Sequence, residues 1–229
     1  MLNNIYNDFY NSIIFQDRYK YILEGLFNTI TMAIFATIIG IVLGLLIALI
    51  NDYHKETGKL KICSLICRIY VAIIRGTPVL LQLMIIYYVI FKSVNTNIIL
   101  IGILAFGLNS GAYVSEIIKS GLISVNPGQM EAGKSLGLSY GQTTRYVILP
   151  QAIKNIKPAL GNEFITLLKE TSVAGYIGIV ELTKASDIIA SRTYDYFFPL
   201  IITSLIYLTL TLFLSKLINK GGNKNATVG

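Results

Sequence analysis

The sequence predicts an all-α, polytopic membrane protein with about five membrane-spanning helices and a structured cytoplasmic loop. Hydrophobic residues make up 54% of its 229 positions and charged residues only 14%, against about 25% charged in a typical soluble domain. Three stretches, 25–51, 93–115 and 196–215, run for 27, 23 and 20 residues without a charge. About 20 helical residues cross a ~30 Å hydrocarbon core, so each stretch is long enough to span a lipid bilayer.

Four or five spans can be read from this pattern, and the charge distribution described below favours five. In chain order they are residues 22–50, 69–91, 98–118, 158–180 and 197–217. The fourth is interrupted by Glu163, Lys169 and Glu170, and an ionisable side chain inside a membrane is costly unless it faces protein or water. The whole chain, 1–229, is therefore expected to form a single transmembrane domain, with its longest inner loop at about 120–157.

Lysine and arginine concentrate in alternate segments of the chain. Residues 51–68, residues 119–157 and the tail from Lys216 to Lys224 hold most of them. With five crossings these segments all lie on the cytoplasmic side, as the positive-inside rule requires. The pattern predicts a multi-pass protein of the cytoplasmic membrane with its N-terminus outside and its C-terminus inside. The same dispersal explains the net charge of +7 without a nucleic-acid partner.

The long inner loop carries the signals of helix ends. Asn126 before Pro127 suits the start of a short helix, about 129–136, because proline there loses no needed N–H. Gly137 suits a left-handed position that ends this helix. Ser139 with Gln142 has the spacing of a capping box for a second helix, which a proline at 150 is expected to stop or kink. Two short helices on the cytoplasmic face are predicted.

The same loop carries a family resemblance. The tripeptide 131–133 (Glu-Ala-Gly) is followed after three residues by Gly137, and after nine more by 147–150 (Val-Ile-Leu-Pro). This spacing resembles the EAA loop of the permeases in binding-protein-dependent ABC importers, with glycine at 133 for the usual alanine and valine at 147 for the usual isoleucine. Residues 75–78 (Arg-Gly-Thr-Pro) and 168–172 (Leu-Lys-Glu-Thr-Ser) look like the polar-amino-acid branch of that family.

The resemblance implies a type I ABC importer permease in which the first short helix is a coupling helix for a separate ATPase subunit. It also implies a second permease chain, identical or paralogous, and an extracytoplasmic amino-acid-binding protein. The positions that it assigns to coupling are Glu131, Ala132, Gly133, Ser135, Leu136, Gly137, Leu149 and Pro150. Small residues permit close backbone approach, and a carboxylate near a helix start suits the helix dipole. The alternative is a solvated loop helix whose glycines are merely caps.

Polar residues within the spans are candidates for a substrate pathway, because ionisable groups there are costly unless they function. These candidates are Arg75, Gln82, Asn109, Glu116, Glu163, Lys169, Thr171 and Ser172. Several have plainer explanations. Arg75 could reach the interface or hold the break at 76–78, and Glu116 could be solvated. Lys169 and Glu170 offer both charges to a zwitterion, or pair structurally between helices.

The energy source is expected in another chain. No G-x-x-x-x-G-K-[ST] phosphate loop occurs in the sequence, so ATP is expected to bind a partner subunit, and this chain is expected to hold no cofactor, metal or catalytic residue. The predicted function is a permease that carries a polar amino acid. An ion-coupled carrier or channel using Glu163, Lys169 and Glu170 is the alternative. A membrane-embedded enzyme is disfavoured because the chain has one histidine and no candidate metal or nucleophile cluster.

Overall fold

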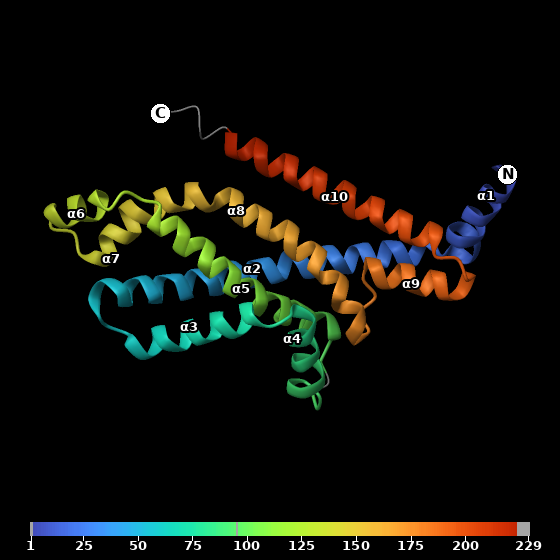
Figure 1. Ribbon diagram of the computed structural model, residues 1–229, viewed down its shortest axis with the longest axis horizontal. Helices are drawn as coiled ribbons and strands as arrows, with labels where there is room; N and C mark the ends of the chain where they lie inside the picture. The colour runs from blue at the N-terminus through green and yellow to red at the C-terminus, as the bar shows by residue number, and fades with distance from the viewer. Residues whose placement is uncertain (1, 95, 224–229) are drawn as a thin grey trace.

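The computed structural model describes residues 2–94 and 96–223, so Lys224 of the predicted inner tail lies outside them. Every regular element in the described residues is helical, which confirms the all-α class. The α-helices (Figure 1) are α1 (Leu2–Phe9), α2 (Tyr19–Thr57), α3 (Lys61–Gly76), α4 (Val79–Ile85), α5 (Ile98–Ile123), α6 (Gly128–Ser135), α7 (Tyr140–Thr143), α8 (Leu149–Glu170), α9 (Leu182–Thr193) and α10 (Phe197–Asn223). Short π or 3₁₀ turns are η1 (Tyr10–Ile14), η2 (Phe15–Asp17), η3 (Ile86–Ile90), η4 (Thr144–Ile148) and η5 (Thr171–Ile177).

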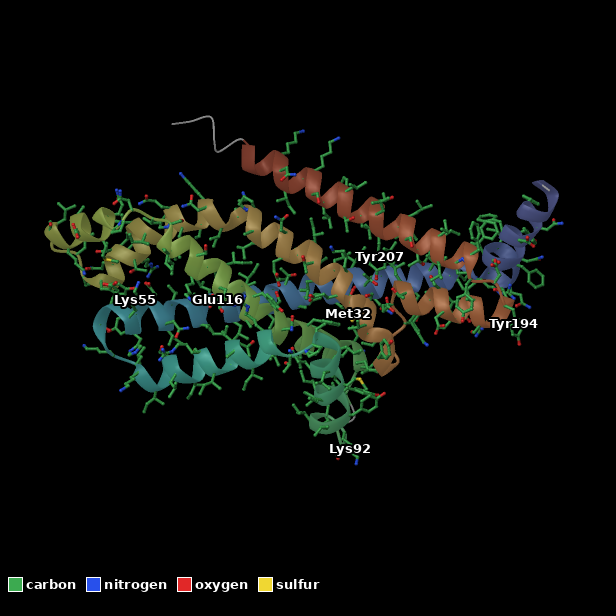
Figure 2. All side chains as sticks on the ribbon, in the orientation of Figure 1. Met32, Lys55, Lys92, Glu116, Tyr194 and Tyr207 are labelled. Carbon is green, nitrogen blue, oxygen red and sulfur yellow. The ribbon has the colours of Figure 1, made fainter. Side chains whose placement is uncertain are left out.

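The helices form an elongated bundle. In Figure 1, α6 and α7 lie at one end, α1 and α9 lie at the other, and α2 runs along most of the length between them. Figure 2 shows Lys55 near the α6–α7 end and Tyr194 at the opposite end, while Lys92 marks the tip of an arm that begins with α4. The short loop helices are thus far from the N-terminal end of the bundle.

Three helices, α2, α5 and α10, are long and apolar enough to cross a membrane. A fourth span is present if α3 and the segment α4–η3 count as one. Helix α8 is too highly charged to count as a membrane-spanning helix by composition, since it carries Lys154, Lys157, Glu163, Lys169 and Glu170. A multi-pass helical membrane protein is confirmed, and five crossings stay a prediction.

The predicted second span, 69–91, is not one straight helix. It bends by 111° between α3 and α4. Thr77 is extended, with φ −127° and ψ 150°, as expected for a residue before proline, and Pro78 has no N–H with which to continue the helix. The break at 76–78 therefore redirects the chain across the other helices rather than along them.

The predicted fourth span, 158–180, is also corrected. Helix α8 starts earlier, at Leu149, and passes Pro158 without ending. The α-helix then stops at Glu170, and the chain continues as the 3₁₀ turn η5 to Gly178, whose φ is +93°. A further helix, α9, lies between the fourth and fifth predicted spans. The hydrophobic run 173–180 therefore belongs to a compact turn and not to the end of a membrane helix.

Helices α2 and α5 pack closely because small residues lie where they cross. A Cβ atom added at Gly40 would lie 2.7 Å from Ser110 Oγ, and one added at Gly44 would lie 2.6 Å from Val114 Cγ1. Gly107 on α5 is equally close to Ile39. Glycines let two backbones approach, which is a common way for membrane helices to associate. The pair α2–α5 forms the centre of the bundle.

Candidate functional site

The predicted caps of the loop helices are confirmed. The Asn126 Oδ1 atom accepts the Gly128 N–H at 2.8 Å, where α6 begins. Gly137 is left-handed, with φ +81°. Ser139 Oγ accepts the Gln142 N–H at 3.3 Å, and Gln142 Oε1 accepts the Ser139 N–H at 2.8 Å. The segment 128–143, called the hairpin below, is held by these local bonds as the sequence indicated.

The second short helix is not separate. Helix α7 runs through the π-helical turn η4 directly into α8, and Pro150 lies in the first turn of α8. Proline cannot donate an N–H to the turn before it, and the π-helical turn η4 directly precedes Pro150. The prediction that Pro150 stops the second helix is wrong, because the helical backbone continues through it from η4 into α8. The hairpin is consequently continuous with the long helix α8.

Most of the positions assigned to coupling are exposed on the hairpin. On the hairpin, the exposed positions among them are Glu131, Ala132, Ser135, Leu136 and Gly137. Beyond it, at the start of α8, Pro150 is exposed and Leu149 is half-buried. Leu136, at the tip of this polar loop, is 81% exposed. Gly133 is buried instead, because a Cβ atom there would lie 2.4 Å from Thr143 Cγ2. The hairpin thus packs through Gly133 and presents Leu136 outward.

Three polar and aromatic contacts join the hairpin to the end of α2. The Tyr140 hydroxyl donates to the Asp52 carboxylate, and the Tyr140 ring lies 5.7 Å from the Tyr53 ring between centroids. Lys134 Nζ lies 3.9 Å from Glu56 Oε2. Burial and the bond to Asp52 raise the pKa of Tyr140, so its hydroxyl keeps its proton. No local pattern predicts the Tyr140–Asp52 contact, because 88 residues separate the two positions.

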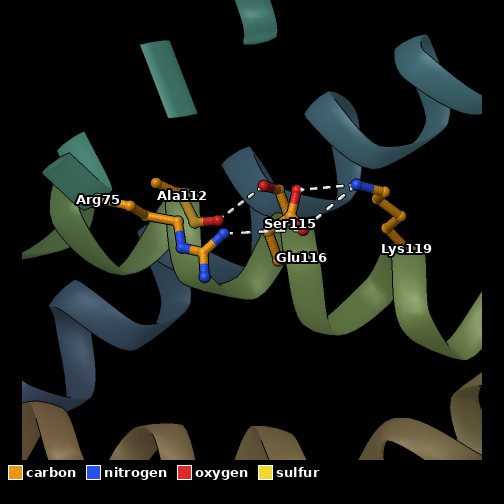
Figure 3. Close-up of polar contacts among 5 residues, drawn as sticks. All are labelled: Arg75, Ala112, Ser115, Glu116 and Lys119. Carbon is orange, nitrogen blue, oxygen red and sulfur yellow. Dashed lines mark hydrogen bonds and ion pairs between the residues drawn. The ribbon is translucent and has the colours of Figure 1, made fainter. Parts of the chain in front are cut away.

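A cavity of about 410 Å³ lies between α3, α5 and α8. It brings together three of the predicted pathway residues, Arg75, Glu116 and Glu163. Figure 3 shows Arg75 and Lys119 reaching Glu116 from two sides, with Arg75 Nη1 at 3.7 Å and Lys119 Nζ at 3.3 Å from Glu116 Oε2. The Arg75 guanidinium also lies 5.6 Å above the Tyr113 ring. Glu116 is therefore an ion-pair partner and not simply a solvated carboxylate.

The Glu163 carboxylate adds a second anionic group to this cavity. Ser110 Oγ donates to Glu163 Oε1 at 3.0 Å, which links α5 to α8. The remaining polar lining comes from Ser120, Ser124 and Asn155, and Asn155 Nδ2 donates to Ser124 Oγ at 2.8 Å. One cavity thus offers a cation, two carboxylates and neutral hydrogen-bonding groups to a small polar molecule.

Gln82 and Asn109 lie together, but they do not line this cavity. The Gln82 Nε2 group donates to the Ile74 carbonyl at 2.8 Å and to the Thr77 carbonyl at 3.0 Å. Its Oε1 atom accepts from Asn109 Nδ2 at 2.9 Å. Carbonyls freed by a helix break need such partners in a membrane. Gln82, and not Arg75, therefore holds the break.

The three candidates beyond Glu163 lie elsewhere as well. Lys169 is exposed, and among the residues that the structure describes it has no carboxylate within 4 Å. Thr171 is buried and donates to the Leu168 carbonyl at 2.7 Å. Ser172 lines a different cavity of about 440 Å³ beside α9. The ion pair considered for Lys169 and Glu170 is not formed within this chain's described part.

One buried carboxylate escaped the sequence prediction. Glu181 is only 1% exposed and caps α9, since its two carboxylate oxygens accept the N–H groups of Thr183 at 2.7 Å and Lys184 at 2.6 Å. Negative charge is favoured at a helix start. Its signal was weak because glutamate is not one of the usual N-cap residues.

Comparison with known proteins gives a consistent result. Residues 40–220 match the family described as binding-protein-dependent transport system inner membrane component. The arginine transport system permease protein ArtQ of Bacillus subtilis is 39% identical over 197 residues, which cover 85% of this chain and 88% of ArtQ. GlnP of Rickettsia conorii, provisionally named a glutamine transport system permease protein, is 38% identical over 213 residues, or 91% of this chain and 95% of GlnP.

Two solved structures share the fold. The crystal structure of an amino acid ABC transporter with histidines matches with a TM-score of 0.81 and 43% identity, covering 90% of this chain and 94% of that chain. An inward-facing structure of the MetNI methionine ABC transporter matches with a TM-score of 0.72 at 20% identity, covering 91% and 96%. The predicted importer-permease fold is confirmed, and the alternative of an ion-coupled carrier is not favoured. The chain belongs to the binding-protein-dependent transport system inner membrane components, and it is the permease subunit of an ABC importer, a transporter and not an enzyme.

Proposed function

We propose that this permease carries a polar amino acid through the cavity between α3, α5 and α8. The observation that carries the proposal is the lining of that cavity by both signs of charge, Arg75 with Glu116 and Glu163. A free amino acid is a zwitterion, so its carboxylate suits Arg75 and its ammonium group suits a carboxylate on the facing helix. The relatives named for arginine and glutamine transport, and the structure with histidines, support this substrate class.

The hairpin is proposed as the docking element for the ATPase subunit. Leu136 projects at the tip, and Glu131 and Ala132 are exposed beside it on α6. A groove on the ATPase subunit that covered Leu136 would remove its apolar surface from water, and the acidic Glu131 suits a cation on the partner. ATP and its hydrolysis belong to that partner, which leaves this chain without a cofactor or metal of its own.

The family implies a solute-binding protein on the outer side and ATPase subunits on the inner side. The hairpin and the end of α10 point towards one end of the bundle, and α1 lies at the other. This arrangement supports an N-terminus outside and a C-terminus inside the cytoplasmic membrane. A second permease chain, identical or paralogous, completes the pathway, since Arg75 remains about half exposed beside the cavity in the single chain.

The cavity is tested by uptake of labelled polar amino acids into vesicles that contain the complete importer and its binding protein. Arg75→Gln removes the charged guanidinium group, and Glu163→Gln replaces a carboxylate by an amide of the same shape. Each should lower uptake about tenfold, because a lost charge-assisted bond of about 1.4 kcal/mol changes affinity by that factor.

The matched control is Glu24→Gln, an isosteric change at an exposed position of α2 away from the cavity. It should transport at the normal rate. Normal uptake by both cavity variants would contradict the proposed pathway.

A further inference from the structure

Helix α2 continues well beyond its uncharged stretch. After residues 25–51, its last turns, 52–57, read Asp-Tyr-His-Lys-Glu-Thr and remain helical to the left-handed cap Gly58. This polar extension carries Asp52, Tyr53 and Glu56, which are the residues that contact the hairpin. The hairpin therefore rests on α2 in addition to its chain connections with α5 and α8.

The contact at Tyr140 is the strongest of these. Tyr140 and Asp52 are both half-buried, and their hydrogen bond joins a phenol to a carboxylate. Bonds to an ionised acceptor are shorter and stronger than neutral ones. The Tyr53 ring at 5.7 Å fixes the orientation of the phenol ring. The exposed Lys134–Glu56 pair at 3.9 Å adds little, because solvent screens such pairs.

The far end of α2 is tied just as specifically to the segment between η5 and α9. Asn28 Nδ2 donates to the Val180 carbonyl at 2.8 Å, and Thr29 Oγ1 accepts the Leu182 N–H at 3.2 Å. A Cβ atom added at Gly25 would lie 2.8 Å from the Glu181 carbonyl carbon. Both Asn28 and Thr29 are buried. A single continuous helix thus joins the hairpin to the opposite end of the bundle.

We infer that α2 is a rigid link through which movement of the hairpin displaces the η5–α9 segment, with Tyr140 and Asp52 as the positioning residues of its inner joint. This inference rests on the proposed docking of the hairpin to the ATPase. A packed helix transmits displacement along its axis, and the joints at its two ends determine whether it follows the hairpin. If the inner joint is lost, the ATPase subunit continues to hydrolyse ATP, but fewer of its cycles displace the η5–α9 segment.

The experiment measures amino acid uptake per ATP hydrolysed by the complete importer in vesicles. Tyr140→Phe removes only the donor hydroxyl, and Asp52→Ala removes the acceptor. Each should lower the uptake-to-hydrolysis ratio about fivefold, and the double variant should be no worse than either single one. Asp52→Asn retains a neutral acceptor oxygen and should give a ratio between those of Asp52→Ala and the wild type, because a bond to a neutral acceptor is weaker than a bond to a carboxylate.

Tyr146→Phe is the matched control, because Tyr146 is 65% exposed on η4 and should keep the normal ratio. A wild-type ratio for Tyr140→Phe or Asp52→Ala overturns the inference, as does an Asp52→Asn ratio no higher than that of Asp52→Ala or an additive double variant. The amount of ATPase subunit that copurifies with each permease variant shows whether the importer assembles. If Asp52→Ala does not assemble, the ratios of Tyr140→Phe and Asp52→Asn test the inference.

Two further variants separate this inference from the proposed function. Glu131→Lys reverses a charge on the docking face, and Gly137→Val places a β-branched residue at φ +81°. If both variants couple transport to hydrolysis normally, the hairpin does not dock the ATPase, and both the proposed docking and the inferred role of α2 are refuted. If both variants are uncoupled while Tyr140→Phe and Asp52→Ala are not, only the role of the Tyr140–Asp52 contact is refuted.

Discussion

Gly133 decides how closely the two arms of the hairpin approach. It is the buried member of the Glu-Ala-Gly tripeptide, and Thr143 of α7, which is fully buried, occupies the space that a side chain would need. Any side chain at 133 therefore competes directly with Thr143. The glycine at this position is matched to the β-branched residue that faces it.

Gly133→Ala should loosen the hairpin. The added methyl group would lie 2.4 Å from Thr143 Cγ2, and overpacking of this kind costs about 1–3 kcal/mol. Amide exchange of residues 128–143 should accelerate about tenfold, and Gly133→Ala with Thr143→Ala should recover most of the protection. Gly141→Ala is the control, because nothing lies within 4 Å of a Cβ atom there. Unchanged exchange in Gly133→Ala would refute this account of the packing.

Local signals at the residue scale were largely sufficient for the hairpin. The caps at Asn126, Gly137 and Ser139 depend on neighbours within a few positions, so the sequence contains them. The partners of Tyr140 and Glu163 do not follow from spacing, because they come from helices 88 and 53 residues away. Such contacts depend on how the helices pack, which no short pattern encodes.

At the scale of elements, the break between α3 and α4 is the clearest departure from the predicted spans. Proline and glycine at 76–78 indicated a break, but its direction depends on Gln82 and Asn109, which are 27 residues apart. Similarly, the charges on α8 hid a long helix from hydropathy, and α9 is too short and polar to be seen as a membrane element. Hydropathy finds apolar helices and misses those that carry several charges.

Gln82→Leu should destabilise this break. It removes the donor for the Ile74 and Thr77 carbonyls and leaves the Asn109 amide without its acceptor. Buried groups left without partners cost about 1–3 kcal/mol each, so the thermal midpoint of the purified complex should fall by about 4–10 °C. Met84→Leu, a volume-conserving change at a 36% exposed position of the same helix, should leave it within a degree or two. Equal midpoints for the two variants would argue against the role given to Gln82.

At the scale of the whole molecule, α2 and α5 behave as one body. Gly40 and Gly44 lie directly against Ser110 and Val114, so neither helix can slide past the other without a clash. The loop hairpin, the cavity wall on α5 and the η5–α9 contact are thus all fixed to this pair. Rearrangement during transport should therefore occur between this pair and α3 or α10.

Spin-label distances test this rigidity. Labels at Val42 and Leu104, which are 56% and 40% exposed on α2 and α5, should give the same distance distribution in the nucleotide-free and ATP-bound importer. The free cysteines Cys63 and Cys67 are first replaced by serine. A shift between the two states larger than the width of the distribution would show that α2 and α5 move separately.

The length of α2 has one more consequence, which concerns the lipid. Its apolar residues 25–50 span roughly 39 Å at about 1.5 Å per residue, whereas the hydrocarbon core is only ~30 Å thick. Such hydrophobic mismatch is relieved by tilting the helix or thickening the bilayer around it. Since α5 is packed tightly against α2, both helices must tilt together. The length of the lipid acyl chains therefore influences the tilt of both helices in the permease.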